Sequence, residues 1–170
     1  MIEEVTTSNI QRLIDKIPVN SDERYRLSPL EKLILCNDGT VQTLLSVLFG
    51  VPIKVEVLHQ EDNGMYILRQ SQLIAEYSPD NIIQVCWAES MISKAGNPEG
   101  FITGIIERGM GIGQLISAIG INTKRELKAM SCGHELFTRT YKIYNVGEKQ
   151  PPLDVVITEI FSRSVYNKLK

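Results

Sequence analysis

The chain has 170 residues and is 43% hydrophobic, enough for one domain with a sizeable core and too short for two ordinary domains, so we expect a single domain over residues 1–170. Its 18 Lys and Arg residues against 20 Asp and Glu give a net charge of -2. This balance gives no reason to expect a nucleic acid or an anionic membrane as a partner, but it allows a small anionic ligand held by a local cation.

The cysteines and the amino-terminal segment indicate the compartment. Cys36, Cys86 and Cys132 are odd in number and widely spaced, which argues against a disulfide framework and is typical of a reducing compartment. The first residues include acidic Glu3 and Glu4 where a signal peptide would be basic. No apolar run approaches the roughly 18 residues of a membrane helix. We therefore expect a cytoplasmic protein.

Three helices are predicted in the first fifty residues. Ser28, with Pro29 next and Glu31 three positions later, has the form of a capping box at a helix start. Apolar residues at helical spacing predict helices over residues 7–17, 28–36 and 41–49, the last ending at Gly50. The loop 37–40 precedes a helix N-terminus, whose free amide groups suit an anion.

From Pro52 the apolar period changes to two, which is typical of strands with one buried face. Short turns join most of these segments, so the strands should pair antiparallel. We predict an α+β fold, an antiparallel sheet of about six strands with helices on one side. The expected strands are 53–59, 65–77, 82–92, 123–130, 137–144 and 154–166, and two short helices are expected at 101–107 and 114–119.

Two charged residues fall on apolar strand faces. Glu159 shares a face with Val155, Ile157 and Phe161, where an ionised carboxylate is costly unless a cation or donor meets it. Arg69 lies on a partly apolar face of an earlier strand. The pattern alone fits a binding site, a structural ion pair between strands, or side chains that reach solvent at the sheet edge.

Other patterns carry less information. The glycines of residues 109–113 let the backbone approach a ligand closely, but they lack the spacing of a dinucleotide fingerprint and also fit a helix break. His59 and His134 are scattered, and Cys132 adds only a second potential ligand beside His134. We expect neither a metal nor a cofactor.

Three stretches, taken in order, resemble motifs of the chorismate lyase family, whose enzymes convert chorismate to 4-hydroxybenzoate and pyruvate without a cofactor. They are an aromatic-x-Leu-Arg strand, a glycine-containing helix start and a terminal Thr-Glu-x-Phe strand, found here at residues 66–69, 110–115 and 155–161. Residues 27–32 and 37–41 are also similar to the opening of a divergent branch in archaea and actinobacteria, long catalogued as a domain of unknown function.

The resemblance implies roles for five residues. The carboxylate-binding arginine of the family falls on Arg69, and its essential glutamate falls on Glu159. Backbone amides at positions matching Thr40 and Ile112 help to hold the ring substituents in that family. Gly113 matches the family's glycine. The resemblance thus implies a substrate site that needs no cofactor.

The resemblance further implies a ligand buried beneath flaps, here residues 28–50 and 98–120. Bacterial members carry an extra basic residue on the strand after the arginine, and the nearest position here is Glu89. No second anion contact is therefore expected at that place. Arg125 could supply a second cation near the pocket, although with Lys124 it also fits a solvated face.

Two functions are compatible with these residues. In the first, a cofactor-free lyase, Arg69 grips the ring carboxylate of chorismate through two hydrogen bonds and Glu159 meets the hydroxyl end, with the ligand between them. In the second, a domain of the same fold binds an aromatic or carboxylate ligand without catalysis. A related cyclohexadiene acid is a further candidate substrate, and the sequence does not determine the oligomeric state.

Overall fold

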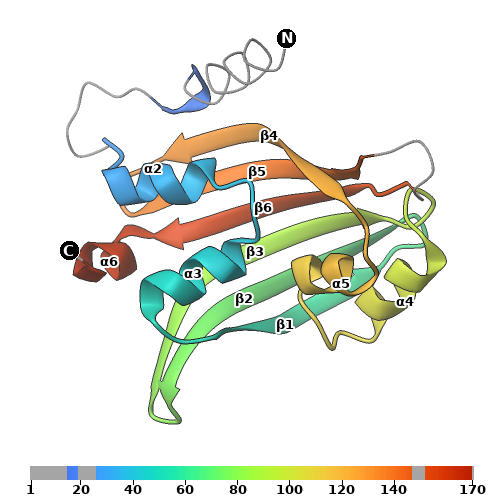
Figure 1. The fold of residues 1–170 in the computed structure, drawn as a ribbon, viewed down its shortest axis with the longest axis horizontal. Coiled ribbons are helices and arrows are strands. Elements are labelled where there is room, and N and C mark those ends of the chain that lie inside the picture. The colour runs from blue at the N-terminus through green and yellow to red at the C-terminus, as the bar shows by residue number, and fades with distance from the viewer. Residues whose placement is uncertain (1–14, 19–25, 147–151, 170) are drawn as a thin grey trace.

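One six-stranded antiparallel sheet organises the computed structural model, which describes residues 15–18, 26–146 and 152–169 (Figure 1). The strand order is β1-β2-β3-β6-β5-β4, so the carboxy-terminal strand lies in the middle of the sheet. This confirms the predicted α+β fold. The strands are β1 (Ile53–Asp62), β2 (Tyr66–Ser78), β3 (Asn81–Ser93), β4 (Thr123–Cys132), β5 (Leu136–Asn145) and β6 (Val155–Ser162).

The helices gather on one face of the sheet. Figure 1 shows α2 and α3 over one part of this face and α4 and α5 over another. None of the helices in the described residues is long and apolar enough to cross a membrane. The helix predicted at 7–17 lies mostly outside the described residues. The helices are α2 (Pro29–Cys36), α3 (Val41–Phe49), α4 (Glu99–Ile106), α5 (Ile112–Ala118) and α6 (Arg163–Tyr166), and the 3-10 turn η2 (Asn167–Leu169) follows.

The local signals around α2 and α3 act as predicted. The Glu31 N–H donates to Ser28 Oγ at 3.2 Å, and the Ser28 N–H donates to Glu31 Oε2 at 2.6 Å, which completes the capping box. Gly50 has φ of 70° and ends α3 in the left-handed conformation. The segment between the two helices is therefore short and fixed at both ends.

Strand and helix boundaries differ from the prediction by a few residues. A bulge between Val57 and His59 lets β1 continue to Asp62 instead of ending at His59. Helix α5 begins at Ile112, two residues early, because the Gln114 side chain accepts a hydrogen bond from the Gly111 N–H at 3.1 Å.

The prediction of one strand from 154 to 166 is wrong at its carboxy-terminal end. Ser162 pairs with Leu136, the first residue of β5, so β6 has no neighbour on that side beyond this point. The Arg163 N–H donates instead to the Glu135 carbonyl at 2.8 Å and the chain turns into α6. Tyr166 thereby enters an aromatic cluster with Phe49, Phe137 and Phe161.

A buried ion pair fastens α2 to the end of β6. Arg163 Nε lies 2.8 Å from Glu31 Oε1, and Nη2 of the same guanidinium lies 3.0 Å from Oε2. Burial alone would raise the pKa of Glu31, but hydrogen bonds from Arg163 and the Ser28 N–H outweigh it and lower the pKa. The ionised carboxylate is therefore the form that the fold stabilises.

Glu31→Gln should lower the free energy of unfolding by about 3 kcal/mol at pH 7, because it removes one charge of the buried ion pair with Arg163. The lowered pKa makes this contribution present above about pH 4.3, the usual Glu value, and lost as the pH falls through the folded-state pKa. Urea unfolding at several pH values measures both effects. As a control, Lys54→Gln breaks the exposed ion pair with Glu76 and should lower the free energy of unfolding by less than about 1 kcal/mol. Equal losses of unfolding free energy in Glu31→Gln and Lys54→Gln would contradict the role given to the buried pair.

Candidate functional site

A cavity of about 60 Å³ lies between the sheet and its helical cover. Its floor is formed where β2 and β3 carry small residues on their inward faces, namely Ser71, Ala88 and Ser90. Larger side chains at these positions would fill the space as they do elsewhere in the core. Apolar walls come from Val55, Leu73, Ile143 and Ile157.

Two short segments cover the cavity, and we call them together the lid. They are residues 40–42 at the start of α3 and residues 111–113 at the start of α5. A Cβ added to Gly113 would lie 3.1 Å from Thr40 Cγ2, so the glycine lets the two segments touch. Thr40, Ile112 and Gly113 all line the cavity, which is where a binding role would place them.

Arg69 is a buried cation whose bonding is incomplete. Its exposed fraction is 2%, and Nη2 donates to the Met110 carbonyl at 2.7 Å. Nε and Nη1 are buried without a hydrogen-bond partner, and no carboxylate among the described residues pairs with this guanidinium. Burial, and then the charge of Arg108, lower the pKa of Arg69, yet a guanidinium keeps its charge in proteins. Both nitrogens are thus available to donate to an anion in the cavity.

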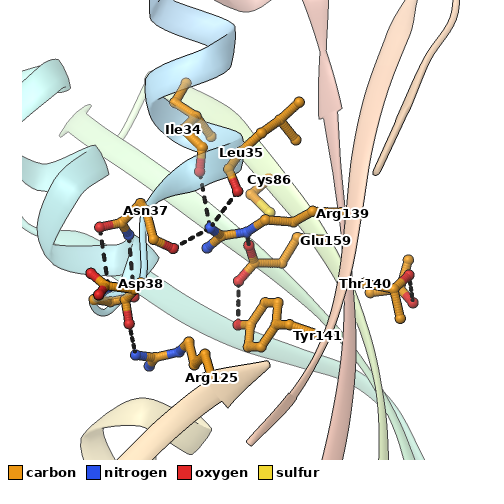
Figure 2. A network of polar contacts seen from close by, with 12 residues as sticks. Ile34, Leu35, Asn37, Asp38, Cys86, Arg125, Arg139, Thr140, Tyr141 and Glu159 are labelled. Carbon is orange, nitrogen blue, oxygen red and sulfur yellow. Dashed lines mark hydrogen bonds and ion pairs between the residues drawn. The ribbon is translucent and has the colours of Figure 1, made fainter. Parts of the chain in front are cut away.

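Glu159 lines the same cavity but pairs with a residue that the sequence analysis did not identify. Arg69 and Glu159 do not form an ion pair with each other, and both line the cavity, as a ligand between them requires. The direct partner is Arg139, whose Nε lies 2.6 Å from Glu159 Oε2 (Figure 2). The reason is register, because Arg139 stands opposite Glu159 on the adjacent β5, whereas Arg69 is two strands away on β2.

Tyr141 completes the surroundings of the carboxylate. Its hydroxyl donates to Glu159 Oε1 at 2.7 Å, and the Arg139 guanidinium lies 5.0 Å from the centre of its ring. Burial, followed by the negative charge of Glu159, raises the pKa of Tyr141 well above 10. The phenol therefore remains a donor, and both carboxylate oxygens of Glu159 are held in place.

Arg139 also holds the end of α2 and the segment that leads to the lid. Figure 2 shows its guanidinium directed at backbone carbonyls of this region. Nη1 donates to the carbonyls of Ile34 at 3.0 Å and Leu35 at 3.3 Å, and also to that of Asn37. Burial would lower the pKa of Arg139, but the charge of Glu159 outweighs it and raises the pKa. The residue stays charged and joins β5, β6 and α2.

Arg125 is the second cation that lines the cavity. Its Nη1 donates to the Asp38 carbonyl at 2.6 Å, and its guanidinium lies 5.7 Å from the centre of the Tyr141 ring. Nε is buried and has no hydrogen-bond partner. Lys124 and Lys128 on the same strand are exposed to solvent, whereas Arg125 is partly buried and lines the cavity.

Comparison with models of known protein families gives no match, and comparison with curated proteins gives no significant match. The interpretation of the site therefore rests on its chemistry and on the motif resemblance. Within the described residues, no three His, Cys, Asp or Glu side chains lie where they could hold a metal ion. The cavity lining is instead suited to an organic anion, since it holds two arginines, Arg69 and Arg125, and one carboxylate, Glu159.

The sequence held a signal for Arg139 and Tyr141. Phe137, Arg139, Tyr141 and Ile143 alternate along β5 in the same way as the residues around Glu159 on β6. An arginine on such a face is as unusual as the glutamate that it pairs with. The alternation alone does not say which arginine meets which carboxylate.

Arg139→Met should lower the free energy of unfolding by about 3–5 kcal/mol, because it leaves Glu159 buried without its partner charge. Urea unfolding measures the loss. The double variant Arg139→Met with Glu159→Gln should be more stable than Arg139→Met alone, since the unpaired charge is then gone. Lys142→Met on the same strand, which breaks an exposed pair with Asp154, should cost less than about 1 kcal/mol. A similar loss in Arg139→Met and Lys142→Met would argue against this role for Arg139.

Proposed function

We propose that this protein is a cofactor-free lyase that converts chorismate to 4-hydroxybenzoate and pyruvate in the cavity beneath the lid. The observation that carries the proposal is the buried Arg69, with Nε and Nη1 unpartnered in the cavity that Glu159 also lines. A buried charge without a counter-ion is costly, and a ligand carboxylate would supply that counter-ion. The resemblance to chorismate lyase motifs implies a substrate-binding role for the same two residues.

The ligand would be held by its carboxylate and by the apolar walls. A guanidinium that donates two parallel hydrogen bonds to a carboxylate fixes the plane of the attached ring, which a lysine would not do. In Arg69 these bonds would come from Nε or Nη1 together with the second N–H of Nη2, which the Met110 carbonyl leaves unused. Leu73, Ile143 and Ile157 offer apolar surface to such a ring. The ring hydroxyl would then point toward Glu159, across the cavity from Arg69.

Glu159 is proposed to act as a hydrogen-bond acceptor for that hydroxyl. Each of its oxygens already accepts one hydrogen bond, from Arg139 or from Tyr141. A carboxylate has about four acceptor positions, so both oxygens can accept another. Because two donors hold the carboxylate, it would orient the substrate without having to move.

The reaction itself needs little from the protein. The C–O bond of the enolpyruvyl ether breaks, the ring carbon that bears the hydroxyl loses its C–H proton, and the enolpyruvyl fragment gains a proton and leaves as pyruvate. The ring becomes aromatic, so the reaction is downhill. The contribution of the site would be to hold a reactive conformer away from water.

The lid must open for such a ligand. A cavity of about 60 Å³ has room for a few water molecules and is too small for a substituted ring. The lid segments meet through Thr40 and Gly113, and Arg69 holds the preceding Met110 carbonyl. A carboxylate that binds Arg69 would therefore enter next to the hydrogen bond that keeps this segment in place.

The second candidate function is a small-molecule binding domain of the same fold without catalysis. It is favoured by the fact that both oxygens of Glu159 are already engaged by Arg139 and Tyr141, as in a purely structural pair. Arg69 would still bind the ligand carboxylate. The two functions share a site and differ in whether the ether bond is broken.

Purified protein incubated with chorismate should release 4-hydroxybenzoate and pyruvate in equal amounts, measured by chromatography and by a lactate dehydrogenase assay. Arg69→Gln should lower kcat/KM by roughly 100-fold, because about 3 kcal/mol of charge-assisted hydrogen bonding is lost. Lys54→Gln, at an exposed position on the neighbouring β1, should leave turnover unchanged.

Each outcome of this assay separates the candidates. Calorimetry that detects chorismate binding without product formation would favour the binding domain. If chorismate does not bind at all, both candidate functions are excluded. Full activity of Arg69→Gln with its fold intact by circular dichroism would refute the assignment of the carboxylate site.

A further inference from the structure

The cavity holds more positive charge than its own residues neutralise. Arg69 and Arg125 both line it, and among the described residues neither forms an ion pair with an Asp or Glu. Glu159 is the one carboxylate in the lining, and it is already paired with Arg139. Two cations are thus left for a ligand: Arg69 has two buried nitrogens without a partner, Nε and Nη1, and Arg125 has one, Nε.

We propose that Arg125 is a specificity-determining residue that binds a second carboxylate of the ligand. The site would then select ring acids with two carboxylates over ring acids with one. This inference rests on the proposed function, in which Arg69 binds the first carboxylate.

The two arginines reach the cavity from widely separated strands of the sheet. Arg69 is on β2 and Arg125 is on β4, and the strand order puts three strands between them. Four strand spacings correspond to about 19 Å between the backbones of a flat sheet. Only the long side chains reach the shared cavity, and they enter it from strands on opposite sides of β6. A ring with carboxylates at two places would offer one group to each arginine.

The surroundings of Arg125 leave one part of the guanidinium available. Nη1 is used by the Asp38 carbonyl and the Tyr141 ring lies beside the group, so its plane is held in one orientation. Nε remains buried and without a partner. A carboxylate is the group that best accepts a hydrogen bond from such a fixed, charged donor.

Arg125 also marks the side from which the second carboxylate would be reached. Together with Tyr141 it lines both the cavity and an adjacent groove of about 650 Å³, to which Lys16 and Lys124 also contribute. The deep end of the cavity at Arg69 would take the ring carboxylate, and the end near this groove would take the second one. Arg125 is only partly buried, so its contribution should be smaller than that of Arg69.

A matched pair of stable ligands tests the proposal. 3-(Carboxymethoxy)benzoate carries a second carboxylate, and 3-propoxybenzoate has an uncharged ethyl group in its place. Calorimetry should give a Kd for the diacid about tenfold lower than for the monoacid, as expected for one charge-assisted hydrogen-bonding group near the surface. Arg125→Gln should abolish this preference while changing the Kd of the monoacid less than about threefold.

Three further variants make the test specific. Arg125→Lys keeps the charge and should retain part of the preference, which also covers the case that Arg125→Gln folds poorly. Lys128→Gln removes an exposed cation from the same strand and should leave both Kd values unchanged. Arg69→Gln should weaken both ligands, because each carries the ring carboxylate.

The results separate this inference from the proposed function. If Arg125→Gln changes the Kd of both ligands equally, Arg125 only holds the Asp38 loop in place and the inference is wrong. If the wild type binds both ligands with the same Kd, the inference is also wrong. If neither ligand binds the wild type, the inference and the proposed site fail together. If the diacid preference depends on Arg125 but chorismate is not turned over, the inference stands and the lyase function fails.

Discussion

The buried contact between Arg139 and Glu159 is the interaction on which the rest of the site depends. It joins two central strands, and the same guanidinium holds three carbonyls at the end of α2. A buried ion pair is often no more stabilising than apolar residues of the same size. Its effect here is orientation, because Glu159 can face the cavity only in the position that Arg139 and Tyr141 impose.

Three arginines from three strands fasten the covering segments to the sheet. Arg139 bonds the Asn37 carbonyl, Arg125 bonds the Asp38 carbonyl and Arg69 bonds the Met110 carbonyl. Each of these guanidinium groups also has a buried nitrogen without a partner. Arg69 and Arg125, the two that would bind an anion, therefore also hold the cover, so ligand binding and the position of the cover depend on the same side chains.

The cavity exists because small residues interrupt a well-packed core. Beyond the cavity, Phe137 and Phe161 stack with ring centres 4.9 Å apart and fill the space between sheet and helices. Ser71, Ala88 and Ser90 leave such space empty on the neighbouring strands. Retaining small and polar residues at the centre of a sheet costs packing energy, which is expected where a ligand completes the core.

Much of the fold and part of the site follow from the sequence by itself. The capping box at Ser28, the stop at Gly50 and the change to a period of two predicted the α+β fold, because these signals act between residues close in the chain. The same alternation identified Arg69 and Glu159 as charged residues on apolar strand faces. It predicted neither their partners nor the end of β6.

Only the tertiary structure decided which charges meet. Arg139 became the partner of Glu159 because β5 and β6 pair in a register that places them opposite each other. The strand ended at Ser162 because its neighbour begins at Leu136. Pairing partners and register depend on contacts between segments far apart in the chain, and a shift of one residue would turn each side chain to the other face. A single sequence shows the faces of its strands, whereas the packed sheet determines what those faces meet.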